Sequence, residues 1–367
     1  MRVDIQSYPN FTLALGKRVP CFASESQVPT LKRPVADKSE VETHSDSPVR
    51  KVLFMGSKRL GLLCLEVIYR SNPSILQGVM TIDDRTDRRS TLDGFKRFCC
   101  KEDIPVFIAR NRKNAETLIS ELRPEFCIVV GWYWLISKET LQVVPRGMIG
   151  LHTSLLPSYR GGSPLVWAML NQETKVGVSL FTLTENMDDG DIWGQAAVPV
   201  ASEDTIQTVL DRLEKAAVVL VRERYPCILE GTATPQPQDH SKATYCALRT
   251  PRDGWIDWSR PARFVYDFIR AQTDPYPGAY TLYQGRKLSI WKASLLPEVY
   301  FGTPGQVARI LEQKVAVVCG DNRAVLLEIV ESESSREPAG RVLRSLKIRF
   351  PVYTPPLLVL ENQRQRS

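Results

Sequence analysis

The chain has 367 residues, of which 43% are hydrophobic and 24% are charged. This composition is that of a globular protein and excludes a fibrous or low-complexity one. The length predicts two domains with an additional tail. The sequence contains no run of 18 apolar residues, so we expect no membrane-spanning helix and no membrane partner.

The positions of the Cys and His residues and the distribution of charge indicate which metal sites and partners to expect. The eight Cys are scattered without a Cys-x-x-Cys pair and the three His are dispersed, so no metal site is expected. Several Cys lie in apolar runs, which favours free thiols in a reducing, cytoplasmic setting. The net charge is +7, and residues 240–367 carry the whole excess, with 19 Lys and Arg against 12 Asp and Glu. A polyanion partner explains this asymmetry, and a solvated basic face without a ligand explains it equally well.

The N-terminal segment differs from the rest of the chain. Residues 1–49 are polar and lack a periodic apolar pattern, so we expect a disordered tail or a non-native extension there. Over residues 50–231, short apolar runs alternate with segments of helical periodicity, which predicts an α/β domain with a mostly parallel sheet. The expected strands are 51–56, 77–82, 104–108, 126–130 and 193–200, and the expected helices are 60–68, 92–100, 115–122 and 205–224.

The ends of the apolar runs locate a candidate binding crevice. The first turn, Gly56 to Gly61, has neither a GxGxxG nor a GxxxxGK[ST] motif, so no nucleotide-phosphate cradle is expected there. In open sheets of this kind ligands bind at the carboxyl ends of the strands, and Gly131, His152 and Asp188 each follow an apolar run. A His and an Asp that meet at such an edge can act as an acid–base pair. Taken alone, the two residues fit a surface His and a turn-forming Asp better.

A second domain begins after a change in composition. Residues 232–250 are rich in Pro, Gln and Thr and are expected to form a linker, followed by a domain over 251–354 and a flexible tail over 355–367. A hairpin should turn at Gln284 and Gly285. The remaining expected elements are a helix at 261–271 and short strands at 305–310, 314–319, 324–329 and 346–350. Such short strands predict a small β-barrel, and its basic charge is typical of barrels that bind oligonucleotides.

Several blocks of sequence resemble the 10-formyltetrahydrofolate-dependent formyltransferases, in the same order. They include His152-Thr-Ser-Leu-Leu-Pro-Ser-Tyr-Arg-Gly161, Trp167-Ala-Met-Leu-Asn171, Met187-Asp-Asp-Gly-Asp-Ile192, Asp253-Gly-Trp-Ile-Asp-Trp258 and Asp274-Pro-Tyr-Pro-Gly-Ala279. The resemblance covers residues 51–330. It implies a Rossmann-like formyltransferase domain followed by an open β-barrel of OB type. It also implies transfer of a formyl group from 10-formyltetrahydrofolate to a primary amine.

The resemblance assigns roles to particular positions. His152 matches a family histidine that would stabilise the oxyanion and shuttle a proton, and Asp188 matches an aspartate that would orient it and help to deprotonate the amine. The folate is then expected against Gly131, Trp132, Tyr133, Leu135 and Asp188, and the acceptor against Thr153, Ser154 and Arg160. For Arg160, contact with an acceptor phosphate and a structural role in the turn are equally open.

One position departs from the family pattern. The family places an Asn two residues before the histidine, where this chain has Gly150, which has no side chain to donate a hydrogen bond. Loss of one oxyanion donor typically costs on the order of 100- to 1,000-fold in rate. Either another donor such as Thr153 substitutes, or the reaction is slower or differently arranged, or the chain binds folate or RNA without efficient transfer.

The acceptor that the resemblance implies first is methionyl-tRNA, and the basic charge of the second domain favours it. An aminosugar nucleotide or another small amine is the alternative, because the loop at 83–90 is short and its arginines are diluted by aspartates. The sequence makes no prediction about the oligomeric state.

Overall fold

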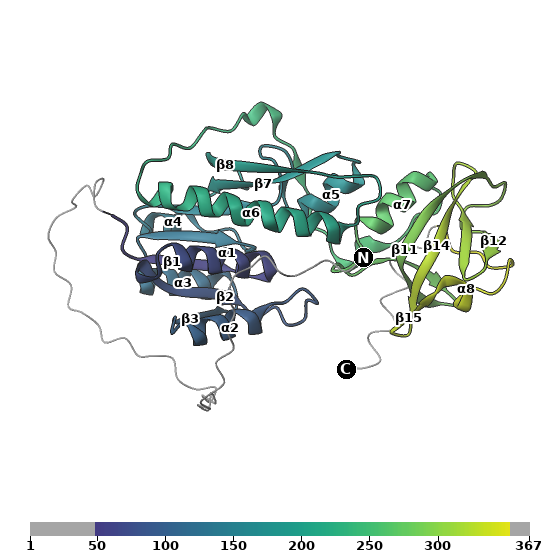
Figure 1. Cartoon of the computed structure of the whole chain (residues 1–367), viewed down its shortest axis with the longest axis horizontal. Coiled ribbons are helices and arrows are strands. Elements are labelled where there is room, and N and C mark those ends of the chain that lie inside the picture. Colours follow the sequence, from purple (N-terminus) through teal and green to yellow (C-terminus); the bar gives the residue numbers. More distant parts are fainter. Residues whose placement is uncertain (1–47, 353–367) are drawn as a thin grey trace, which may run out of the picture. The chain divides into compact units, whose positions relative to one another are not determined.

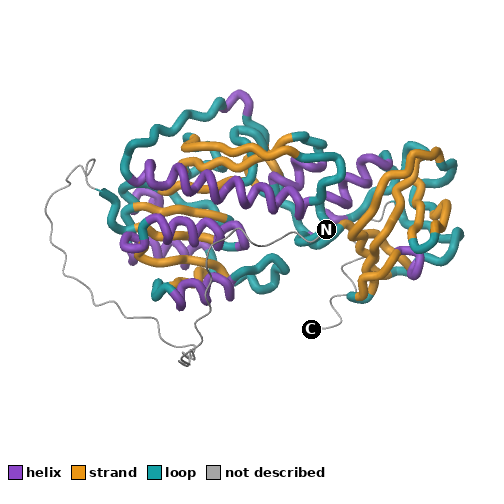
Figure 2. Tube along the Cα trace, in the orientation of Figure 1, coloured by secondary structure: helices purple, strands orange, loops and turns teal. Residues whose placement is uncertain are grey.

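Figures 1 and 2 show the computed structural model of the chain, which describes residues 48–352. The tail predicted at 355–367, and all but the last two residues of the tail predicted at 1–49, lie outside the described residues. Val49 is 7% exposed and packs into the hydrophobic core, so core packing begins just before the predicted domain start. Within the described residues, no helix is both long enough and apolar enough to cross a membrane.

The first sheet has seven strands in the order β3-β2-β1-β4-β5-β7-β8. The first five strands in this order are parallel to one another, whereas β7 is antiparallel to both β5 and β8, which confirms a mostly parallel sheet. The strands are β1 (Val52–Gly56), β2 (Leu76–Ile82), β3 (Val106–Ala109), β4 (Phe126–Val130), β5 (Met148–His152), β7 (Lys175–Thr182) and β8 (Ile192–Pro199). The helices are α1 (Lys58–Ser71), α2 (Leu92–Lys101), α3 (Arg112–Leu122), α4 (Lys138–Val143), α5 (Pro164–Leu170) and α6 (Ile206–Leu229).

Helices cover both faces of this sheet, and the strand sequences explain why. β1 is buried along its whole length, as expected for a continuous apolar run in a parallel sheet. Its alternate residues enter two different cores, because successive side chains of a strand point to opposite faces. Phe54 packs with residues of α1, α2 and α6, whereas Met55 packs with residues of α3. Figure 1 shows α1 and α6 together on one face of the sheet.

The direction of β7 corrects one expectation. The sequence pattern put Asp188 at the exit of a strand that points to the same edge as the others. Instead β7 is antiparallel to β5, so its last residue, Thr182, pairs with Ile149 near the start of β5. The loop after β7 turns back along the sheet and brings Asp188 beside His152 at the end of β5. The loop, and not the strand, delivers the carboxylate.

The segment predicted as a linker, 232–250, lies in close contact with the first sheet region. Gln236 pairs with Ile192 at the start of β8. Further on, β9 (Tyr245–Cys246) pairs in parallel with β6 (Arg160–Gly161), a two-residue strand in the loop after β5. The segment therefore contributes backbone structure next to the carboxyl ends of the parallel strands.

The C-terminal region forms an antiparallel sheet in the order β10-β11-β14-β13-β12, with β15 on the side of β14. Its strands are β10 (Ala279–Tyr283), β11 (Arg286–Val299), β12 (Val307–Leu311), β13 (Lys314–Val318), β14 (Arg323–Ser332) and β15 (Ser335–Pro338), with helices α7 (Ala262–Arg270) and α8 (Ala339–Val342). The hairpin at Gln284 and Gly285 is confirmed, with φ of 51° and 77° at its turn. The strand predicted at 346–350 is wrong, since only a single bridge joins Arg349 to Gln306. The OB-type topology remains a prediction.

Candidate active site

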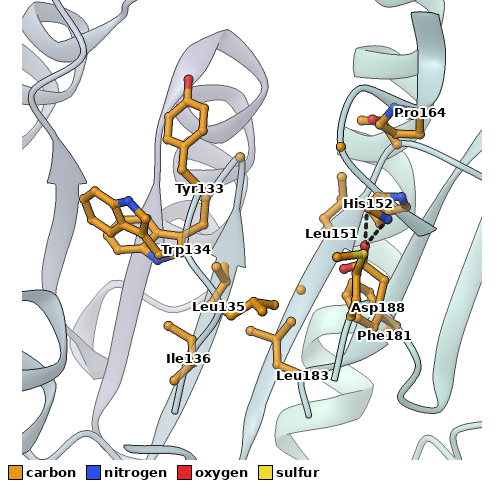
Figure 3. A pocket seen from close by; sticks show the side chains of 18 of the residues that line it. Tyr133, Trp134, Leu135, Ile136, Leu151, His152, Pro164, Phe181, Leu183 and Asp188 are labelled. Atoms are coloured by element: carbon orange, nitrogen blue, oxygen red, sulfur yellow. Dashed lines mark hydrogen bonds and ion pairs between the residues drawn. The ribbon is translucent and has the colours of Figure 1, made fainter. Parts of the chain in front are cut away.

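A cavity of about 400 Å³ opens at the carboxyl ends of β4 and β5. Figure 3 shows its two walls, one formed by Tyr133 to Ile136 after β4, the other by the end of β5 with Phe181, Leu183 and Asp188. The predicted site residues that line it are Gly131, Trp132, Tyr133, Leu135, His152, Thr153 and Asp188. Two predicted residues, Ser154 and Arg160, are not part of its lining.

His152 and Asp188 meet at this cavity. Nδ1 of His152 lies 3.5 Å from Oδ2 of Asp188, and the histidine side chain is 12% exposed. Nε2 of His152 lies 2.8 Å from the backbone oxygen of Tyr159. Because a carbonyl oxygen only accepts hydrogen bonds, Nε2 carries the proton of the neutral ring and Nδ1 presents its lone pair on the side of the carboxylate. A proton taken up at Nδ1 is then stabilised by the adjacent negative charge.

The backbone of Gly161 holds the Asp188 carboxylate in place. Its N–H donates to Oδ2 of Asp188 at 2.8 Å. Gly161 has a φ of 98°, and a Cβ there would lie 2.6 Å from the oxygen of Cys246 and 2.9 Å from the sulfur of Met187. Only glycine satisfies both the dihedral angle and the close approach, which explains why the motif has glycine at position 161.

Gln238 also positions the aspartate, and sequence reasoning missed it. Its Nε2 donates to the backbone oxygens of Asp188 at 2.9 Å and Gly190 at 2.7 Å, and the residue is 5% exposed. Its Oε1 accepts from the Arg160 guanidinium at 2.7 Å. Nothing in the composition of the segment 232–250 distinguished this glutamine, because its contacts are with residues far away in the sequence.

The placement of Arg160 and Ser154 does not support their predicted contact with the acceptor. Arg160 is 2% exposed, and besides Gln238 its guanidinium donates to the hydroxyl of Tyr245 at 3.3 Å. The structural role left open by the sequence is the one that this geometry favours. Ser154 is 5% exposed and its hydroxyl donates to the oxygen of Ser158 at 2.7 Å, which closes the loop between them.

The surroundings of Gly150 are apolar and filled. The residue pairs with Phe181 across β5 and β7 and lines the cavity two residues before His152. A Cβ at Gly150 would lie 2.7 Å from Cδ2 of Leu183 and 3.0 Å from Cε1 of Phe181. The space that a side chain at position 150 would enter is therefore occupied by two hydrophobic groups. Sequence reasoning missed both, because the only signal is a cross-strand register that local patterns do not give.

Aromatic residues line the cavity together with His152 and Asp188. The rings of Trp132 and Trp134 pack edge to face with centroids 5.3 Å apart. Nε1 of Trp132 is buried and has no hydrogen-bond partner within the described part of the chain. The cavity volume is in the usual range for small-molecule sites.

Cys246 lies close enough to Asp188 for the carboxylate to affect its thiol. Burial, together with the neighbouring Asp188 carboxylate, raises the pKa of Cys246 to about 11. At neutral pH the group is therefore a thiol and not a nucleophilic thiolate. In residues 48–352, no group of three or more His, Cys, Asp and Glu is arranged to hold a metal ion.

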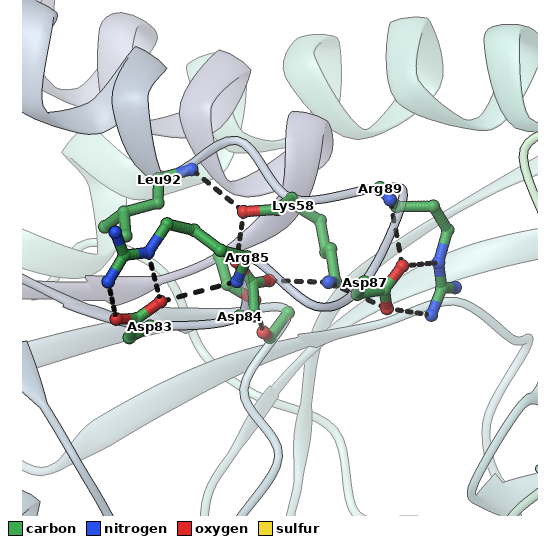
Figure 4. Close-up of polar contacts among 10 residues, drawn as sticks. Lys58, Asp83, Asp84, Arg85, Asp87, Arg89 and Leu92 are labelled. Carbon is green, nitrogen blue, oxygen red and sulfur yellow. Dashed lines mark hydrogen bonds and ion pairs between the residues drawn. The ribbon is translucent and has the colours of Figure 1, made fainter. Parts of the chain in front are cut away.

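A cluster of charged residues adjoins the cavity at Tyr133 (Figure 4). Nζ of Lys58 lies 2.5 Å from a carboxylate oxygen of Asp84 and 2.9 Å from one of Asp87, and 5.4 Å from the centre of the Tyr133 ring. Burial opposes charge at Asp87, but hydrogen bonds from Arg89 and Lys58 outweigh it and hold the pKa of Asp87 well below its usual range. Burial likewise opposes charge at Lys58, yet its carboxylate partners raise its pKa.

The arginines of this loop are paired with carboxylates. The pairs are Arg85 with Asp83 at 2.6 Å, Arg88 with Asp274 at 3.6 Å and Arg89 with Asp87 at 2.7 Å. The ring of Tyr276 in the C-terminal region lies 4.5 Å from the Arg89 guanidinium. The loop therefore connects the rim of the cavity to the C-terminal region through charges that are already compensated.

Two family models match the chain. The formyl transferase model covers residues 94–224, and the formyl transferase C-terminal domain model covers residues 249–346. The chain belongs to the formyltransferase family, and it is a transferase enzyme of that family. The methionyl-tRNA formyltransferase of Acetivibrio thermocellus is 31% identical over 291 residues, which are 78% of this chain and 93% of that protein. The methionyl-tRNA formyltransferase of Alkaliphilus oremlandii is 30% identical over 78% of this chain and 93% of its own length.

Solved structures share the fold. The N-formyltransferase from Helicobacter canadensis, in complex with folinic acid and dTDP-3-aminofucose, superimposes with a TM-score of 0.57 at 18% identity, covering 76% of this chain and 98% of that one. HypX from Aquifex aeolicus, in complex with tetrahydrofolic acid, gives a TM-score of 0.56 at 20% identity over 84% of this chain and 51% of that one.

Proposed function

We propose that this enzyme transfers the formyl group of 10-formyltetrahydrofolate to the amino group of methionyl-tRNA. The observation that carries the proposal is the similarity to methionyl-tRNA formyltransferases along 93% of their length, including the C-terminal region. We place the transfer step in residues 50–231. Residues 251–354, which carry an excess of basic side chains, contribute to binding of the RNA.

His152 and Asp188 are the groups we assign to proton transfer. The amine nitrogen bonds to the formyl carbon, the bond from that carbon to N10 of the folate breaks, and the amine proton finally resides on N10. His152 accepts the proton at Nδ1, because Nε2 is already engaged with the Tyr159 carbonyl. Asp188, held by Gly161 and by Gln238, stabilises the imidazolium that forms.

The aromatic lining is the part of the cavity that we assign to the folate. Trp132 and Tyr133, with Gly131 and Leu135, offer flat apolar surface for a pterin ring. Because Gly150 contributes no side chain, we assign oxyanion stabilisation to the Thr153 hydroxyl, which also lines the cavity.

An aminosugar nucleotide is the second candidate acceptor, and one observation favours it. The three arginines of the loop at 83–90 are paired with carboxylates, so this loop adds little net positive charge for an RNA backbone. The Helicobacter canadensis enzyme, which shares the fold, was solved with such a nucleotide sugar.

A direct assay separates the two acceptors. Full-length protein is supplied with 10-formyltetrahydrofolate and either methionyl-tRNA or a dTDP-aminosugar, and release of tetrahydrofolate is followed by absorbance. We expect release with methionyl-tRNA and none with deacylated tRNA, which lacks the amine. Release with the aminosugar nucleotide alone would overturn the methionyl-tRNA proposal, and release with neither would overturn both.

A further inference from the structure

A second cavity, of about 430 Å³, is lined by both residues of β9 and by Ser158 and Tyr159, which precede β6. Its lining differs from that of the first cavity and includes three aromatic side chains, Tyr159, Trp167 and Tyr245, together with Glu173 and Asn171. The backbone oxygen of Tyr159 receives the hydrogen bond from Nε2 of His152. The second cavity is therefore one residue away from the groups that we assign to proton transfer.

Tyr245 presents an unusual apolar surface at this place. It is 66% exposed, and the neighbouring Leu248, which lines the first cavity, is 74% exposed. The buried guanidinium of Arg160 lies 5.8 Å from the centre of the Tyr245 ring and donates to its hydroxyl. One side of the ring is thus supported by the protein, and much of the ring remains in solvent. Large exposed hydrophobic groups beside an active site commonly mark a binding surface.

A chain of polar groups defines the chemistry at the other end of the cavity. The amide of Asn171 donates to the hydroxyl of Tyr159 at 3.2 Å, and this hydroxyl donates to Oε1 of Glu173 at 2.6 Å. Because the hydrogen bonds run in this direction, the chain ends on a carboxylate, which only accepts. A ligand that suits the cavity needs a flat ring to stack and an N–H group to donate.

We propose that this second cavity binds an amino-bearing nucleobase of the acceptor, stacked on Tyr245 and donating its exocyclic amino group to Glu173. The inference rests on the proposed function, since both candidate acceptors carry a nucleobase linked to the reacting amine. Stacking on an aromatic side chain is the usual way in which single-stranded nucleic acid is held. A carboxylate can accept from the exocyclic amino group of adenine, cytosine or guanine, whereas thymine and uracil have no amino group and offer only their ring N3–H. The geometry thereby favours the adenine- and cytosine-containing end of a tRNA over a thymidine diphosphate sugar.

Nucleotide binding can be measured without formyl transfer. Full-length protein is titrated with AMP, CMP, UMP and TMP, and saturation-transfer NMR signals of the nucleotides give their relative affinities. We expect AMP and CMP to bind at least about ten-fold more tightly than UMP and TMP. Replacement Tyr245→Ala should weaken AMP binding on the order of ten-fold. The matched control is Phe301→Ala, another exposed aromatic residue (87% exposed), which should leave binding unchanged.

A second variant tests the carboxylate separately. Glu173→Gln still accepts from Tyr159 but can also donate, so it should lose the preference for AMP over UMP. Equal binding of AMP and TMP by the unmodified protein, or AMP binding that Tyr245→Ala leaves unchanged, would overturn the inference. These results do not depend on turnover, so a failure here is distinct from absence of tetrahydrofolate release, which bears on the proposed function.

Discussion

The two charged clusters beside the first cavity are built in opposite ways (Figures 3 and 4). In the first, His152 and Asp188 are held by backbone groups of Tyr159 and Gly161, which leaves Nδ1 of the imidazole open toward the carboxylate. In the second, Lys58, Arg85 and Arg89 are paired with carboxylates of the same region. Charges that are compensated hold a structure, whereas a site that reacts needs a group with an unused hydrogen-bonding position.

Removal of the reactive cluster should have the largest effect. We expect His152→Asn and Asp188→Asn each to lower kcat by about 100- to 10,000-fold, because each removes a proton-transfer group or its counter-charge. Asp189→Asn is the matched control, since Asp189 bonds to the nearby Thr184 and Asn186 and does not line the cavity. Steady-state tetrahydrofolate release measures the effect. Turnover that stays within a few-fold of the unmodified enzyme in Asp188→Asn would refute the assignment.

A hydrogen-bond donor introduced at Gly150 should increase the activity of the reactive cluster, provided that space is made for its side chain. Gly150→Asn alone should destabilise the protein by about 1–3 kcal/mol, because its Cβ meets Leu183 at 2.7 Å. Combined with Leu183→Ala, the same change should raise kcat up to on the order of 100-fold over Leu183→Ala alone, as expected for a restored oxyanion donor. Thermal unfolding and kcat are measured on all three variants. If the double variant gains no rate, the site does not lack a donor there.

Gln238 holds the backbone of the loop that carries Asp188, so replacing it should have an intermediate effect on kcat. Gln238→Glu keeps an acceptor for Arg160 but cannot donate to the backbone oxygens of Asp188 and Gly190. We expect kcat to fall on the order of ten-fold, because the aspartate loop loses its position. Gln238→Leu removes both contacts and should also lower the melting temperature. Equal kcat in Gln238→Glu and the unmodified enzyme would show that the loop is held by other groups.

The compensated cluster should affect stability and not turnover. The low pKa of Asp87 in the folded protein means that its contribution to stability is present above the unfolded-state value of 3.8 and is lost as the pH falls below it. Asp87→Asn should therefore flatten the decrease in unfolding free energy between about pH 4 and pH 2, as measured by urea titration. Asp93→Asn, an exposed residue of α2, is the control. If the free energy of unfolding of Asp87→Asn falls as steeply below pH 4 as that of the unmodified protein, the assignment is contradicted.

The sequence predicted those features that depend on local pattern. Continuous apolar runs such as Phe126–Val130 identified the buried strands, and the motif around His152 identified the carboxyl edge of the sheet as the site. The features that it missed depend on register between distant segments. The antiparallel direction of β7 sets Phe181 opposite Gly150. In the same way, the pairing of Gln236 with Ile192 brings Gln238 beside the Asp188 loop.

Because β9 pairs with β6, the structural unit that contains the proposed active site extends beyond residue 231. A chain cut at residue 231 would lose Gln238, the backbone partner strand of Gly161 and the exposed ring of Tyr245. Such a cut removes part of the proposed active site instead of separating two independent modules. Fusions, insertions and minimal fragments of this enzyme therefore need to retain residues 232–250 together with the first sheet.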